Sequence, residues 1–226
     1  MLIIDKYAYT NKLKDKNPLA KFYFAIFFLI LAIVSKKFYI HIAILSVMFF
    51  ITITIAKIPL KKYIKMILIP SSFLVLSILA ILISVSKGNG EYIISMELYN
   101  VNIGITNGSI ENGRILFTRS LSAITCTFFL ILTTPMNDII YILKKHRVPK
   151  LLIEMMVLIY RFIFILLEEY KNIYTAQQLR FGYINIKNSF KSLSALISVL
   201  FTRIMLKYEH MEMALDSKGF DNEFYV

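Results

Sequence analysis

The chain has 226 residues, of which 58% are hydrophobic and 18% are charged, and its formal net charge is +12. A soluble domain carries about 25% charged residues, so this composition and the long apolar runs exclude an ordinary soluble protein and indicate an integral membrane protein. The basic residues lie mainly between the apolar runs, which is typical of loops beside anionic lipid and argues against nucleic acid as a partner.

The first 21 residues are rich in lysine and begin with an apolar stretch that is too short for the core of a signal peptide. We expect this segment to remain part of the protein. Four apolar stretches then approach the length of about 20 residues that a membrane-spanning helix needs. They are residues 19–34, 38–56, 64–85 and 115–133.

Two basic residues fall inside these expected spans. Lys21, near the start of the first, is expected to extend its ammonium group to the membrane interface. Arg119, in the first turns of the fourth, is interpreted as a residue that pairs helices, with a direct role in transport as the alternative.

Lysine and arginine mark alternate connections between the spans, whereas the connection after residue 85 contains glutamates instead. Because cytoplasmic loops carry the excess of basic residues, we expect both the N-terminus and the region after the fourth span to be cytoplasmic. The basic groups are Lys6, Lys12, Lys14, Lys16 and Lys21, then Lys57, Lys61, Lys62 and Lys65, then Lys144, Lys145, Arg147 and Lys150.

The connection formed by residues 86–113 holds five of the seven glycines and short alternating stretches. This pattern predicts a small hairpin or a re-entrant turn. It fits either a plain surface loop or a contact with a partner subunit.

The last third of the chain is interrupted by charges too often for a span, and its periodicity is that of amphipathic helices. Polar or small residues recur every seven positions, which places them on one stripe of a helix. We therefore predict two long helices, 151–181 and about 190–217, after a short helix between Pro135 and Pro149. The stripe consists of Glu154, Arg161, Glu168, Thr175 and Gly182.

The expected fold is thus all-α, with about four N-terminal transmembrane helices followed by a coupling region of one short and two long amphipathic helices. Because the fourth span ends near Pro135, we predict a transmembrane domain of residues 1–135 and a cytoplasmic domain of residues 136–226. Both long helices end in a cation and a glycine, Arg180 with Gly182 and Lys218 with Gly219. Each glycine is a natural helix C-cap, and each cation complements the negative end of the helix dipole.

Four stretches in this order resemble the transmembrane T component of energy-coupling factor (ECF) ABC transporters, and most of all the cobalt-type CbiQ family. They are "IDKYAYTNKLKDKNPLAKF", "GRILFTRSLSAITCTFFLILTTP", "VPKLLIEMMVLIYRFIFILLEE" and the two cation–glycine endings. The endings correspond to the family's paired Ala-Arg-Gly signatures. Here Phe181 separates Arg180 from Gly182, and Lys218 stands where the family has arginine.

The resemblance implies a non-catalytic subunit in the plasma membrane of a prokaryote. It would join two ABC-type ATPase subunits to a CbiM-like substrate-binding membrane subunit, for cobalt or alternatively for nickel or a vitamin. Arg180, Gly182, Lys218 and Gly219 would then contact the ATPases, and Glu154, Arg161 and Glu168 would support the packing of the long helices.

Two rival classes have weaker support in the residues. A membrane-embedded enzyme would need clustered carboxylates or a nucleophile with its base, and the five aspartates form no close cluster. A stand-alone secondary transporter would need polar groups near mid-span and usually an inverted repeat. With one cysteine and three scattered histidines, we expect no metal site, no cofactor and no catalytic residue in this chain.

Overall fold

The computed structural model describes residues 3–82, 84–86, 92–98, 101–217 and 219. Packing of the backbone divides the chain into two units, the first ending at Ile139 and the second beginning at Ile140. Each unit is described by itself.

The first unit is built from five α-helices. They are α1 (Ile3–Thr10), α2 (Pro18–Val34), α3 (Phe38–Phe50), α4 (Leu60–Leu82) and α5 (Asn107–Thr133), and a π-helical turn, η1 (Ile51–Ile55), continues α3. Helix α2 begins one residue before the predicted span, because the side chain of Asn17 accepts a hydrogen bond from the backbone N–H of Leu19 and Pro18 occupies the first helical turn.

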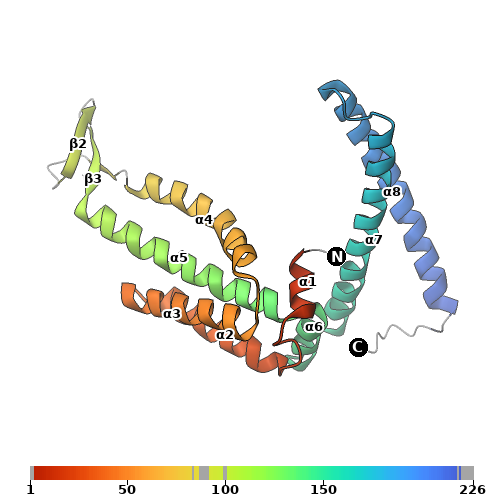
Figure 1. The fold of residues 1–226 in the computed structure, drawn as a ribbon, viewed down its shortest axis with the longest axis horizontal. Coiled ribbons are helices and arrows are strands. Elements are labelled where there is room, and N and C mark those ends of the chain that lie inside the picture. Colours follow the sequence, from red (N-terminus) through yellow and green to blue (C-terminus); the bar gives the residue numbers. More distant parts are fainter. Residues whose placement is uncertain (1–2, 83, 87–91, 99–100, 218, 220–226) are drawn as a thin grey trace. The chain divides into compact units, whose positions relative to one another are not determined.

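Helix α5 is the centre of this unit, since α2, α3 and α4 all pack against it. Figure 1 shows α5 running between α4 on one side and α2 with α3 on the other. Small side chains at the contacts, among them Ala25, Ala32 and Cys126, allow the helices to approach closely, as in other membrane bundles. Arg119 on α5 donates a hydrogen bond to the carbonyl oxygen of Ile33 on α2, which is the helix-pairing contact expected of it.

The fold is not purely helical, because the connection between α4 and α5 contains a small antiparallel sheet. Strands β1 (Ser84–Ser86), β2 (Tyr92–Leu98) and β3 (Val101–Thr106) pair in the order β1-β3-β2. This finding confirms the predicted hairpin, and the sheet is a small addition to a fold that is helical elsewhere in the described residues. Helix α5 also begins eight residues before the predicted span, because Thr106 caps it by accepting a hydrogen bond from the backbone N–H of Ser109.

Four helical segments of the described chain are long and apolar enough to cross a membrane, which confirms a multi-pass protein. They are Phe38–Ile55, Leu60–Ile81, Gly108–Thr133 and Ile186–Ser217. Two details differ from the expectation. Helix α2 is apolar but has only 17 residues. The last segment, expected to be unable to span, has the required length and apolar composition, because only Lys191 and Arg203 interrupt its most apolar part.

The second unit contains most of the short helix α6 (Met136–Lys145) and both long helices, α7 (Lys150–Leu179) and α8 (Ile186–Ser217). The predicted short helix between Pro135 and Pro149 is therefore confirmed. It ends because Arg147 adopts a left-handed conformation (φ 57°) and the N–H of Val148 bonds back to the carbonyl of Leu143.

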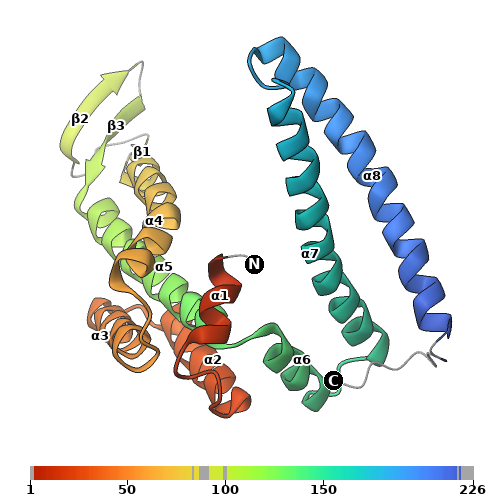
Figure 2. The same ribbon diagram turned by 45° about the vertical axis from the view of Figure 1, so that its right-hand side comes forward.

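Helices α7 and α8 form an antiparallel hairpin that is closed at its turn and opens toward the other end (Figure 2). Near the turn, Ile173 and Leu196 are buried. Farther along, an apolar groove of about 500 Å³ lies between the helices, and Phe162 and Tyr208 are among the residues that line it. One cluster of charges bridges the pair, in which Glu169 contacts Arg203 at 3.0 Å and Lys207 at 3.9 Å.

Candidate functional site at the tip of the long helices

The turn between α7 and α8 begins with a complete helix-capping motif. The N–H of Gly182 bonds to the carbonyl of Gln177 at 2.9 Å, and the N–H of Phe181 bonds to the carbonyl of Gln178 at 3.0 Å. These two hydrogen bonds define a Schellman motif, in which the residue after the cap is left-handed. Phe181, with φ of 59°, holds that position, so the expectation that Gly182 provides the left-handed cap is wrong.

Gly182 is required for a different reason, which is space. A β-carbon at this position would lie 2.6 Å from Oγ of Ser192 and 2.9 Å from the carbonyl oxygen of Gln177. Ser192 on α8 uses this closeness, since its hydroxyl donates a hydrogen bond to the carbonyl of Gly182 at 2.8 Å. The missing side chain therefore lets the turn lie directly on the first turns of α8.

Gln177 completes the connection between the two helices. Its Nε2 donates to the carbonyl of Ser192 at 2.9 Å, and its Oε1 accepts from the hydroxyl of Tyr183 at 2.7 Å. The Tyr183 ring also contacts Tyr174, with centroids 4.9 Å apart, and Tyr174 stacks on Tyr170. Desolvation among these rings raises the pKa of the Tyr183 hydroxyl.

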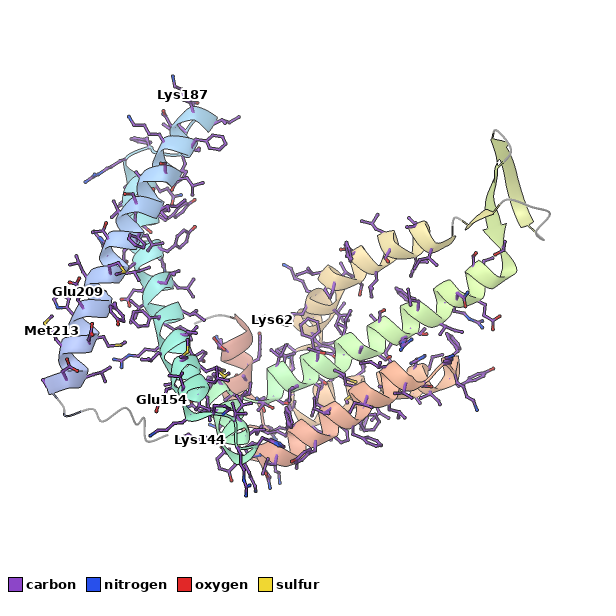
Figure 3. All side chains as sticks on the ribbon, turned by 180° about the vertical axis from the view of Figure 1, so that it is seen from behind. Lys62, Lys144, Glu154, Lys187, Glu209 and Met213 are labelled. Atoms are coloured by element: carbon purple, nitrogen blue, oxygen red, sulfur yellow. The ribbon has the colours of Figure 1, made fainter. Side chains whose placement is uncertain are left out.

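This rigid turn presents cationic and apolar side chains to its surroundings. Arg180 is exposed, and the large apolar side chains around it are between 65% and 79% exposed. No acidic residue occurs between Glu169 and Glu209, whereas four basic residues do occur near the turn. Figure 3 shows Lys187 at the turn and Glu209 far along α8. The apolar residues are Leu179, Phe181, Ile184, Ile186 and Phe190, and the basic ones are Lys171, Arg180, Lys187 and Lys191.

The end of α8 has a simpler geometry. Gly219 adopts a left-handed conformation with φ of 64°, and its N–H bonds to the carbonyl of Asp216 at 3.0 Å. A β-carbon here would meet nothing within 4 Å, so the glycine is needed for its conformation rather than for space. Lys218, the cation predicted beside it, lies outside the described residues.

The three residues predicted to support the packing of the long helices occupy different environments. Arg161 and Glu168 are exposed on α7. Oε1 of Glu154 is buried, and it has no hydrogen-bond partner within the described part of the chain. Their packing role stays a prediction, while Glu169, which the seven-residue pattern passes over, makes the ion pairs with α8.

A second polar centre lies at the base of the first unit, and sequence reasoning missed it. Lys21 is 5% exposed, so its side chain is buried by protein, whereas the sequence suggested only that it extends to the membrane interface. Its ammonium group donates to the carbonyls of Leu13, Lys14 and Thr133 and contacts Oδ2 of Asp138 at 3.1 Å. The sequence did contain a signal for this centre. Lys21 lies within an apolar run, right after a polar loop, and a charge in that position needs buried acceptors or water.

Asn11 reinforces the same centre. Its Nδ2 donates to the carbonyls of Tyr7, Ala8 and Leu132 at 2.7–3.1 Å. Asn11 and Lys21 thus bind the consecutive carbonyls of Leu132 and Thr133, which the end of α5 leaves without helical partners. Among the described residues, no group of three or more His, Cys, Asp or Glu lies close enough together to hold a metal ion.

These features define a class, a multi-pass helical membrane protein whose last two helices form a long hairpin with a rigid, cationic and apolar tip. The model of the family described as CbiQ, cobalt transport protein, matches residues 10–226. The chain therefore belongs to the CbiQ family, the non-catalytic transmembrane components of ECF transporters.

Individual relatives agree with this assignment. The chain is 34% identical over 221 residues to an uncharacterised protein of Methanocaldococcus jannaschii, which covers 98% of this chain and 81% of the relative. It is 34% identical over 170 residues to the cobalt transport protein CbiQ of Salmonella typhimurium, and these residues cover 75% of this chain and 76% of that relative. It is also 32% identical over 220 residues to a putative fused cobalt transport protein CbiMQ of Methanocorpusculum labreanum, covering 97% of this chain and 36% of that longer protein.

Proposed function

We propose that this chain is the energy-coupling subunit of a cobalt importer and that it transmits the action of two ABC-type ATPase subunits to a substrate-binding membrane subunit. The name of the Salmonella relative supports cobalt as the solute. The fused relative supports a CbiM-like partner, because two proteins joined in one chain commonly work together. Nickel or a vitamin is the alternative solute.

The observation that carries the coupling role is the construction of the tip. A rigid-body mechanism needs stiff levers with anchored ends. Helix α7 ends in a Schellman motif, and the side chains of Gln177 and Ser192 fasten it to α8. The tip then exposes Arg180, whose planar guanidinium suits carboxylate groups in a groove, beside the apolar ring of Phe181.

In this proposal each ATPase subunit receives one helix end. Arg180 and Gly182 serve one, and Lys218 and Gly219 serve the other. The transmembrane domain comprises residues 1–135 and the cytoplasmic coupling domain comprises residues 136–226, with both termini in the cytoplasm. The basic connections and the basic tip support this orientation. The cobalt site belongs to the substrate-binding subunit.

Replacing Arg180 and Lys218 together with glutamate tests the coupling role. Reversing both charges should weaken co-purification of the ATPases and reduce ATP-dependent uptake in vesicles that contain the whole complex. The matched control is the pair Lys36→Glu and Lys37→Glu, which reverses two exposed charges in the turn between α2 and α3. Normal ATPase binding and normal uptake in the Arg180 and Lys218 variant would contradict the proposal.

Uptake by the same vesicles with radioactive cobalt or nickel identifies the solute. We expect ATP-dependent accumulation of cobalt and none with this chain alone. Accumulation by the isolated chain without ATP would instead support a stand-alone transporter.

A further inference from the structure

We infer that Lys21 and Asp138 form a latch that fixes the start of α6 to the membrane bundle and is needed to convert ATP hydrolysis into transport. This inference rests on the proposed coupling function and adds positioning residues that lie far along the chain from the tip. Both residues belong to the first unit, and α6 continues from Asp138 into the second unit.

The first step of the argument is the number and origin of the bonds. An ammonium group has three hydrogens to donate. Four acceptors surround that of Lys21 at 3.1–3.3 Å, two from the loop before α2, one from the last residue of α5 and one from the first turn of α6. One side chain of α2 therefore joins three other parts of the chain at the place where the bundle ends.

The second step concerns electrostatics. Lys21 is 5% exposed and the side chain of Asp138 is 24% exposed, so water screens their attraction less than that of a surface pair. The cation faces the C-terminal end of α5, and the carboxylate lies in the first turn of α6. Each charge thus complements the dipole of the helix end beside it.

The third step is the cost of separation. Moving Asp138 away would leave a buried cation with only backbone carbonyls as partners, which is unfavourable compared with the closed state. Thr134 and Pro135, the residues that connect α5 to α6, are also buried, and the extended conformation of Thr134 ends α5. Motion delivered along α6 would therefore be passed to α2 and α5 instead of being absorbed in the connection.

The test measures solute transported per ATP hydrolysed in the complete complex, in vesicles. Asp138→Asn keeps the shape of the side chain and removes its charge. We expect the complex to assemble and ATP hydrolysis to continue, while the ratio of transport to hydrolysis falls about tenfold, within the usual range of coupling between distant sites. The matched control is Asp15→Asn, since Asp15 is an exposed carboxylate in the loop before α2.

A second set of variants addresses folding and pairing. Lys21→Met can lower expression, so Lys21→Arg serves as the conservative variant and should retain most of the ratio. If the two residues act as a pair, the ratio of transport to hydrolysis in the double variant Lys21→Met with Asp138→Asn should be no lower than in Lys21→Met alone.

An unchanged ratio in Asp138→Asn would overturn the latch, and so would a parallel loss of assembly, hydrolysis and transport in every variant, which indicates a structural role only. The proposed function fails differently, by normal ATPase binding when Arg180 and Lys218 are reversed.

Discussion

The hydroxyl of Ser192 lies 2.8 Å from the carbonyl oxygen of Gly182, and it occupies the space that a side chain at Gly182 would need. Gly182→Ala should therefore push α8 away from the turn. We expect a loss of about 1–3 kcal/mol in the free energy of unfolding, the usual range for overpacking. Thermal unfolding of the purified protein measures it.

The control for this prediction removes only one of the two clashes. Ser192→Ala combined with Gly182→Ala takes away the contact with Oγ but keeps that with the carbonyl of Gln177. The double variant should therefore recover only part of the stability. An unperturbed Gly182→Ala protein would show that the turn has room to spare.

We predict that Phe181 lowers the stability of the protein but strengthens its binding to the ATPases. A left-handed conformation costs a residue with a side chain about 1–2 kcal/mol, and glycine avoids that cost. Phe181→Gly should thus raise the unfolding temperature slightly, while the loss of the 71% exposed ring weakens binding of the ATPases. Phe181→Asn is the matched control, because asparagine tolerates the same conformation but also lacks the ring. Equal ATPase binding by all three proteins would sink the idea that the ring is a contact.

Glu169 should matter more than its neighbour Glu168. Glu169→Gln removes the partner of Arg203 and Lys207, whereas Glu168 is exposed on α7. We expect Glu169→Gln to cost about 1 kcal/mol, since the two cations are half exposed, and Glu168→Gln to cost less. Chemical denaturation at low and high salt checks both values, and the difference should shrink at high salt. A larger loss of stability in Glu168→Gln than in Glu169→Gln would contradict this prediction and favour the seven-residue stripe as the face that packs against α8.

We predict that Lys57 affects the stability of the protein in two separable ways, through its backbone conformation and through its side chain. It is left-handed, with φ of 56°, and its side chain, first through a hydrogen bond and then through its charge, lowers the pKa of Lys12 below the usual 10.5. Between the lowered pKa and 10.5 the unfolded state binds more protons than the folded state, so stability should rise with pH in that window. Lys57→Gln should weaken this pH dependence, because it removes only the charge.

Lys57→Gly should weaken the pH dependence further, because it also removes the side chain that forms the hydrogen bond. It should relieve the backbone strain as well, so its unfolding temperature should exceed that of Lys57→Gln. Thermal unfolding at several pH values below 10.5 measures both effects. A pH dependence that survives both substitutions would mean that the charge of Lys57 does not act on Lys12.

Long, strongly patterned elements were predictable from the sequence, whereas contacts between distant residues were not. The spans and the long helices follow from apolar length and periodicity, and α6 lies between Pro135 and Pro149 as expected. Helix α8 begins at Ile186, four residues before the prediction, because helix ends depend on local capping. The left-handed Phe181 contradicts its intrinsic preference, and only the tertiary contacts of the turn impose it. Lys21 could be recognised as costly, but no sequence pattern names Thr133 and Asp138 as its partners.

The hydrogen bonds of Lys21 and Asn11 also have a consequence for the order of biosynthesis. Lys21 bonds to the carbonyl of Thr133, which is 112 positions later in the chain, and Asn11 bonds to that of Leu132, which is 121 positions later. The N-terminal segment is therefore synthesised long before these two acceptors, although the local carbonyls that Lys21 and Asn11 also contact are already present. The N-terminal segment can therefore complete its contacts only after the end of α5 has been synthesised, so these two bonds depend on all the helices from α2 to α5.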